Sequence, residues 1–170
     1  SPNLFATNQA QPWSLDGSIA LEGATNDGSL RRQASIAEDG QVFIGLERRD
    51  ECGQVQIYDS ENIVGGVSQV LSRADAGLSC DRPDFFGSNI VRVDQRLFIS
   101  APNILTSVEG EQVPGGEIFI YEQQNSVNGE LSAHWSFSQR IDGAELGLLG
   151  MGYQLASDGE RIFTQNNGQR

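Results

Sequence analysis

Three short segments in which apolar and polar residues alternate lie close together in the middle of the chain. They occupy residues 90–93, 97–99 and 118–121, and the breaks between them contain Asp94-Gln95, Pro102 and Gly115-Gly116. Alternation with a period of two predicts strands that have one buried face, and Asp, Gly and Pro are typical of the turns between strands. We therefore predict three antiparallel strands in this region.

The same arrangement recurs on both sides of this central unit. Residues 34–45 and 53–58 repeat all three segments, and residues 151–163 repeat the first two. A further short strand precedes each unit, at residues 13–15, 68–71 and 135–137. A repeat of about 60 residues with four strands is typical of a β-propeller blade rather than of a solenoid turn.

Several motifs of the central unit resemble the FG-GAP repeats of integrin-α-type propellers, in their bacterial variant. The resemblance rests on Phe86-Gly87, on Ser100-Ala101-Pro102 and on residues 116–121. It covers most of the chain, from Trp13 to Phe163. It implies a propeller fold, but it indicates function only broadly, because similar repeats serve adhesion, carbohydrate binding and enzyme scaffolding.

The flanking units depart from this pattern. Arg32-Gln33 and Met151-Gly152 occupy the positions where Phe-Gly is expected, and Gly45-Leu46 replaces the Gly-Ala-Pro exit. We interpret both units as degenerate repeats of the same type.

The predicted fold is all-β, a partial β-propeller of four-stranded antiparallel blades. Residues 1–12 are expected to form a linker or entry segment and residues 13–170 the propeller segment, with blade repeats near 33–71 and 86–137 and partial blades at 13–19 and 151–170. About two complete blades and parts of two more give eleven strands, whereas rings of four to eight blades need about 16–32. We therefore expect further chain, or another subunit, to complete the propeller.

The composition narrows the class of partner. All 11 basic residues are Arg, and 23 acidic residues give a net charge of −12. Such a charge makes nucleic acid an unfavourable partner. No run approaches the ~18 apolar residues of a membrane-spanning helix, so we predict no membrane insertion. A lysine-free acidic surface fits a secreted or cell-surface protein, although solubility alone explains it equally well.

The predicted strand directions sort the connections onto two ends of the sheets. Tight turns at Asp39-Gly40, Asp94-Gln95 and Asp158-Gly159 share one end, and the long polar connections share the other. Long loops on a rigid scaffold are the usual place for binding. The candidate ligand- or partner-binding residues on the long-loop end are Arg48, Arg49, Asp50, Asn103, Glu109 and Glu111.

For this charged set two interpretations remain open. A solvated loop is the simpler explanation for residues 48–51, and the alternative is a contact in which Arg binds carboxylates or sulfates. Glu109 and Glu111 are surface loop residues or, alternatively, contribute with Asn103 to a cation site. We predict no calcium in the tight turns, because two or three residues around Asp39, Asp94 or Asp158 offer too few of the 6–8 oxygens required. No cofactor is expected.

Cys52 and Cys80 are the two cysteines of the chain. The predicted topology places both on the long-loop end, so we predict a disulfide between them. Two unpaired structural thiols are the alternative, and the absence of a CxxC spacing disfavours a metal or redox site.

Sequence motifs for catalysis are weak. His134 is the single histidine and is predicted to lie on the surface of an outer strand, and no motif singles out a pair among the 23 acids.

Trp13 and Trp135 occupy equivalent repeat positions, which indicates packing between blades rather than sugar stacking. Together with these weak catalytic motifs, the resemblance to FG-GAP repeats implies a non-enzymatic extracellular binding or adhesion module for a protein or glycan partner. A structural subunit of a larger assembly is the alternative, and a propeller-scaffolded hydrolase or lyase is a more distant one.

Overall fold

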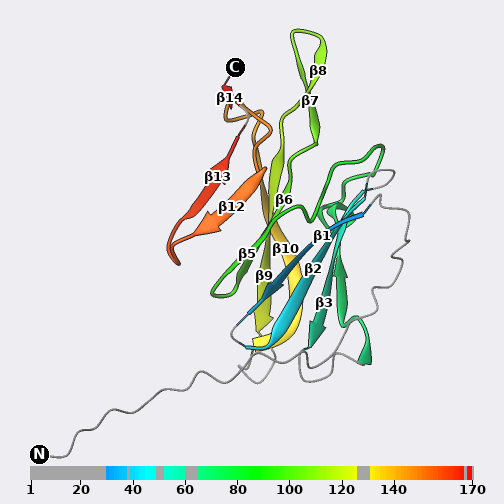
Figure 1. Cartoon of the computed structure of the whole chain (residues 1–170), viewed down its shortest axis with the longest axis vertical. Coiled ribbons are helices and arrows are strands. Elements are labelled where there is room, and N and C mark those ends of the chain that lie inside the picture. Colours follow the sequence, from blue (N-terminus) through cyan, green and yellow to red (C-terminus); the bar gives the residue numbers. More distant parts are fainter. Residues whose placement is uncertain are drawn as a thin grey trace, which may run out of the picture.

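Antiparallel strands make up the computed structural model of the chain, and its described residues contain no α-helix (Figure 1). The structure describes residues 30–37, 39–48, 52–59, 65–125, 131–166 and 168–169. The predicted all-β fold class is confirmed. The predicted outer strand at residues 13–19 lies outside the described residues.

The first four described strands form one antiparallel sheet, which we call sheet A. It contains β1 (Leu30–Ile36), β2 (Gln41–Arg48), β3 (Gln54–Asp59) and β4 (Gln69–Leu71) in the spatial order β1-β2-β3-β4. Each strand therefore pairs with the next one along the chain. Gly40 supplies the left-handed backbone (φ 83°) that the tight turn between β1 and β2 requires.

Sheet B repeats this arrangement in the second half of the chain. It contains β5 (Ile90–Val93), β6 (Arg96–Ala101), β9 (Glu117–Asn125) and β10 (Leu131–Asp142) in the spatial order β10-β9-β6-β5. The two predicted four-stranded antiparallel sheets are thus both present. The turn at Asp94-Gln95 is as short as predicted, with Asp94 in a left-handed conformation (φ 51°).

A hairpin between β6 and β9 differs from the polar loop that we predicted there. It contains β7 (Leu105–Val108) and β8 (Glu111–Pro114), joined by Glu109 and Gly110. Both turn residues have positive φ, 52° and 88°, which is the conformation of a two-residue hairpin turn. The polar residues of these strands hide their alternation, so the sequence pattern missed them.

The C-terminal part forms two shorter pairs of strands. β12 (Gln154–Ser157) pairs with β13 (Ile162–Gln165), and β11 (Leu148–Leu149) pairs with β14 (Gly168–Gln169). The β12–β13 hairpin is the predicted beginning of a third unit. Its connection spans residues 158–161 and is longer than the two-residue turn that we predicted.

The main hydrophobic core lies between sheets A and B. Sheet A contributes Phe43, Val55 and Ile57, and sheet B contributes several side chains, all fully or almost fully buried: Ile90, Leu97, Ile99, Phe119, Tyr121 and Trp135. The Trp135 ring meets Phe43 edge to face at 5.8 Å and donates from Nε1 to Gln41 Oε1 at 3.1 Å. The prediction that Trp135 packs between neighbouring sheets is confirmed.

The first strands of successive units lie side by side. β1 contacts β5, and β5 contacts β12. At the tight-turn end, the ion pair between Arg92 Nη1 and Asp39 Oδ1 (2.7 Å) joins β5 to sheet A. At the other end, Asn89 Nδ2 donates to the carbonyls of Gly152 (3.1 Å) and Tyr153 (3.0 Å), which join β5 to β12.

Successive units also dock through close backbone contacts at glycine. A Cβ on Gly53, just before β3, would overlap the Phe86 carbonyl, and a Cβ on Gly116, just before β9, would overlap the backbone of Met151. Phe86-Gly87 and Met151-Gly152 thus make the same contact with the preceding sheet. The equivalence that we predicted for these two dipeptides is confirmed.

Candidate functional site

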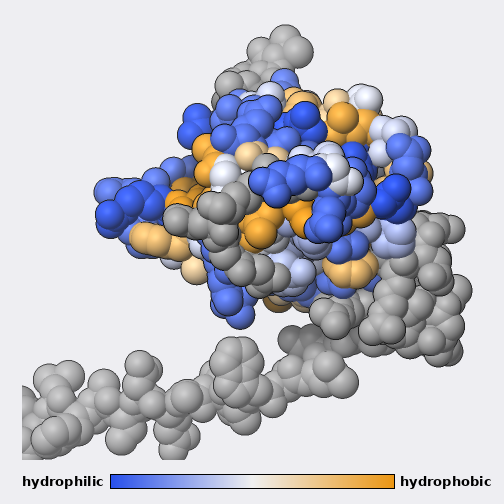
Figure 2. Space-filling view, turned by 90° about the horizontal axis from the view of Figure 1, so that it is seen from above, coloured by the Kyte–Doolittle hydropathy of each residue, from blue (hydrophilic) through white to orange (hydrophobic). Residues whose placement is uncertain are grey.

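Long connections gather at one end of the sheets, as predicted, and we call this end the loop face. It comprises residues 52–53, 72–89, 102–116 and 143–153, at the top of Figure 1. Figure 2 looks down on this end and shows mostly hydrophilic groups with scattered hydrophobic ones. Here the chain passes from sheet A to sheet B and from sheet B to β12.

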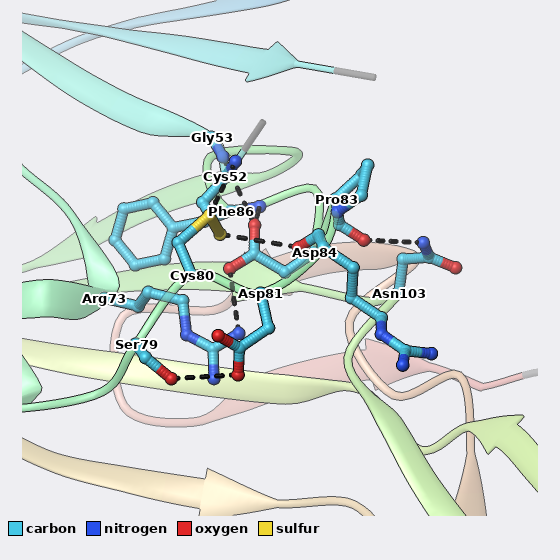
Figure 3. Close-up of a disulfide and its surroundings, with 11 residues drawn as sticks. Cys52, Gly53, Arg73, Ser79, Cys80, Asp81, Pro83, Asp84, Phe86 and Asn103 are labelled. Atoms are coloured by element: carbon cyan, nitrogen blue, oxygen red, sulfur yellow. Dashed lines mark hydrogen bonds and ion pairs between the residues drawn. A yellow bond between two sulfur atoms is a disulfide. The ribbon is translucent and has the colours of Figure 1, made fainter. Parts of the chain in front are cut away.

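A disulfide links two parts of the loop face. Cys52, just before β3, and Cys80, in the crossing to sheet B, are bonded, with Cα atoms 5.7 Å apart (Figure 3). The predicted pairing is confirmed. Closing a loop with a separation of 28 residues stabilises the fold by about 3.6 kcal/mol in the chain-entropy model. Disulfides persist in oxidising environments, so the bond indicates such a compartment.

Asp84 lies beside this disulfide and is 1 % exposed. Its Oδ1 accepts the backbone N–H of Gly53 (3.2 Å) and of Phe86 (3.0 Å), while Oδ2 accepts from Arg73 Nη1 (3.3 Å) (Figure 3). The Asp84 carbonyl accepts the N–H of Asn103 (3.2 Å). Asp84 therefore links three segments of the loop face, residues 52–53, 72–89 and 102–116.

A short 3₁₀ helix, η2 (Arg73–Ala76), fixes the start of this crossing. Asp75 Oδ2 accepts the N–H of Ser72 (2.7 Å), and the Tyr121 hydroxyl donates to the Ser72 carbonyl (2.7 Å). Burial raises the pKa of Tyr121, and the nearby Asp75 carboxylate raises it further. Tyr121 therefore stays protonated and keeps η2 attached to the core.

A polar hollow of about 340 Å³ opens where the first strands of the three units reach the loop face. Its lining comes from β1, β2, the loop before β5 and the start of β12: Gln33, Glu47, Phe85, Gly87, Ser88, Asn89, Pro102, Tyr153 and Gln154. Glu47 is 6 % exposed and its Oε2 accepts from Ser88 Oγ at 2.7 Å. This hollow joins three consecutive repeat units in one site.

The structure separates the predicted binding residues. Asn103 is half-buried and donates from Nδ2 to the Pro83 carbonyl (2.9 Å), so it supports the loop rather than a ligand. Glu109 forms the tip of the β7–β8 hairpin and Glu111 follows it, both exposed. Four residues of strand separate that tip from Asn103, about 13 Å at strand spacing. Asn103 therefore lies before the first strand of this hairpin, and Glu109 and Glu111 lie at its tip.

The remaining predicted residues are only partly covered. Arg48 ends β2, and its side chain lies outside the described residues, as do Arg49 and Asp50. His134 lies in β10 and is exposed, as predicted.

In the turn between β12 and β13, Asp158 Oδ1 accepts from the N–H groups of Glu160 and Arg161, at 3.0 and 2.8 Å. That carboxylate thus stabilises its own turn.

Asp84 and the residues that line the hollow were missed by the sequence analysis. Asp84 precedes Phe86-Gly87 by two residues, but the equivalent positions of the flanking units hold Leu30 and Leu149, so the repeat pattern does not single it out. Glu47 and Ser88 come together across 41 positions of sequence through the docking of two sheets, and no local pattern reveals such a pair.

A second buried carboxylate, Glu117, begins β9. Its side chain is 5 % exposed, Oε1 accepts from Arg140 Nη1 at 2.9 Å, and Oε2 has no partner among the described residues. Burial raises the pKa of Glu117, and the Arg140 guanidinium opposes this shift. Ionisation of Glu117 therefore costs more in the folded protein than in the unfolded chain.

We expect Glu117→Gln to become more stable relative to the wild type as the pH rises from 4 to 8. Glu117 is protonated in both states well below its reference value of 4.5, so the variant has no advantage there. Above the raised folded pKa the wild type bears the full cost of the buried charge. Urea midpoints measured across this range test the trend, with exposed Glu122→Gln as a control. An advantage that shrinks with rising pH would contradict the assignment.

Among the described residues, no three His, Cys, Asp or Glu side chains are grouped so that they could hold a metal ion. The helices in the described part lack the length and apolar character needed to span a bilayer. A comparison with protein-family models finds no match to this chain, and neither does a search of curated proteins.

Proposed function

We propose that this chain is an FG-GAP-type propeller segment that works outside the cell as a non-catalytic binding or adhesion module. Its loop face is the binding surface for a protein or glycan partner. The supporting observation is the rigid construction of that face, where the Cys52–Cys80 disulfide and the buried Asp84 hold three chain segments together. Rigid loops bind with a smaller loss of conformational entropy than mobile ones.

The charge of the loop face also fits this role. The β7–β8 hairpin projects from it and carries exposed Glu109 and Glu111 at its tip (Figure 1). With a net charge of −12, the chain favours a neutral or basic partner surface. The disulfide is consistent with the secreted or cell-surface location that this role requires.

Binding of the full chain to arrays of extracellular proteins and glycans, followed by paired charge changes, tests the proposal. Glu109→Arg/Glu111→Arg at the hairpin tip should weaken binding of any partner found by about tenfold, because interface charges govern complementarity. Gln124→Arg/Glu160→Arg, exposed near the tight-turn end, is the control. Melting temperatures of both variants should stay within a few degrees of the wild type. If the control proved the more damaging to binding, the loop face would be the wrong side.

A structural subunit completed by further chain is a second candidate. A hollow of about 970 Å³ lies between sheet B and the β12–β13 hairpin, with Phe98 and Ile162 in its lining, and Phe163 is 52 % exposed. Apolar side chains beside an exposed strand edge favour pairing with another chain. An obligate second chain in the native protein would favour this candidate over the binding module.

A further inference from the structure

We propose that the hollow between β1, β5 and β12 binds a neutral, hydroxyl-rich ligand of monosaccharide size. This inference rests on the proposed binding function and adds to it a site and a ligand class. The hollow, at about 340 Å³, is near the lower limit of small-molecule sites. It therefore has room for one sugar ring rather than for an extended chain.

Hydrogen-bonding groups of the hollow suit hydroxyl groups. The Glu47 carboxylate is an acceptor, and the buried Gln33 Oε1 has no hydrogen-bond partner among the described residues. An unpaired buried acceptor is costly, and a ligand donor would remove that cost. The last torsion of a glutamine side chain is broad, so the Gln33 amide can turn toward a ligand.

Tyr153 is one of the residues that line the hollow, and it is 40 % exposed. Its neighbour Gln154 supplies an exposed amide, which can both donate and accept. An apolar ring beside convergent polar groups matches a sugar, which has an apolar face and hydroxyl edges.

The walls of the hollow are held in place before any ligand arrives. The backbone N–H of Asn89 donates to the Ser100 hydroxyl oxygen (3.0 Å), and its side-chain Nδ2 donates to the Gly152 and Tyr153 carbonyls. Ser88 is tied to Glu47. Because these lining residues are already held in place, they lose little conformational entropy when a small ligand binds.

The net charge of the chain argues against an anionic ligand. A charge of −12 repels sulfated or phosphorylated molecules, and no basic side chain is among the described residues that line the hollow. Neutral pyranosides are therefore favoured over acidic ones. An organic cation is the competing ligand class, and the experiment includes it.

The test uses the ¹⁵N-labelled full chain titrated with methyl glucopyranoside, methyl galactopyranoside, methyl mannopyranoside and, separately, agmatine as an organic cation. At least one pyranoside should shift the amide signals of Ser88, Asn89 and Gln154 with a dissociation constant on the order of 1 mM. Agmatine should leave these amide signals unchanged. Binding of agmatine without any pyranoside, or no binding of either, would overturn the proposal.

Variants assign that binding to the hollow. Gln33→Leu removes an acceptor that has no described partner in the fold, so it should keep or raise stability while weakening pyranoside binding about 3- to 10-fold. Tyr153→Ala should weaken binding at least about fivefold, and Tyr153→Phe should restore it. Phe163→Ala, which removes an exposed ring outside the hollow, should leave binding unchanged.

The sugar site in the hollow and the binding role of the loop face can be rejected independently of each other. Pyranoside affinity that is unaffected by both Gln33→Leu and Tyr153→Ala would overturn the site. If array partners still depend on Glu109 and Glu111 while no pyranoside binds, the hollow is rejected and the binding module stands. If pyranosides bind but reversal of the hairpin charges has no effect on array partners, the hollow stands and the wider loop face is rejected.

Discussion

Asp84→Ala is expected to lower the free energy of unfolding by about 4 kcal/mol. The substitution leaves the N–H groups of Gly53 and Phe86 without their acceptor in a buried place, at a cost of about 1–3 kcal/mol each. It also removes the carboxylate that pairs with Arg73, whose side chain is 16 % exposed. Chemical denaturation measured by circular dichroism gives the value directly.

Two further substitutions separate the contributions of Asp84. Asp84→Asn keeps an oxygen for both N–H groups but places an NH₂ donor opposite Arg73, which loses the charge and the acceptor of that pair. Its loss of stability should therefore be about half as large. Asp81→Ala, in the same crossing and exposed, should change stability by no more than about 0.5 kcal/mol. Equal losses for Asp81→Ala and Asp84→Ala would show that Asp84 does not organise the loop face.

Gly116→Ala is expected to lower the free energy of unfolding by about 2–5 kcal/mol, because it separates sheet B from the next unit. Two costs add at this position. Gly116 has φ +74°, which costs an L-residue about 1–2 kcal/mol. Its new Cβ would also overlap the backbone of Met151, and overpacking costs about 1–3 kcal/mol more.

Gly77 offers a matched control with almost the same backbone. It has φ +71°, and a Cβ placed there meets nothing within 4 Å. Gly77→Ala should therefore show the backbone cost alone, about 1–2 kcal/mol. The difference between the two variants measures the docking of Met151-Gly152 on sheet B. Equal losses of unfolding free energy in the two variants would mean that this close contact adds nothing to stability.

The period-two pattern was sufficient to predict sheets A and B, because most of their strands bury at least one face in a hydrophobic core. Phe43, Leu97 and Ile99 follow that rule and are fully buried. The β7–β8 hairpin was missed because it projects from the core, so its strands need no apolar face. Pattern reasoning detects burial, and an exposed hairpin leaves little such signal.

The loop face was predicted in outline, and its chemistry was not. Strand direction alone places Cys52 near Cys80, so the disulfide followed from topology. The pairing of Ser88 with Glu47 and the burial of Asp84 depend on how neighbouring units dock. Charged residues that look prominent in sequence, such as Glu109 and Glu111, are solvent-exposed at a hairpin tip.

A radial arrangement of repeat units is the central claim, because the loop face and the hollow both depend on it. A crystal structure of the native protein tests this claim most directly. It should show β1, β5 and β12 innermost around one axis, with the tight turns at one end and the Cys52–Cys80 disulfide at the other. Sheets A and B packed as a closed two-layer sandwich, with β1 and β5 at distant edges, would contradict it.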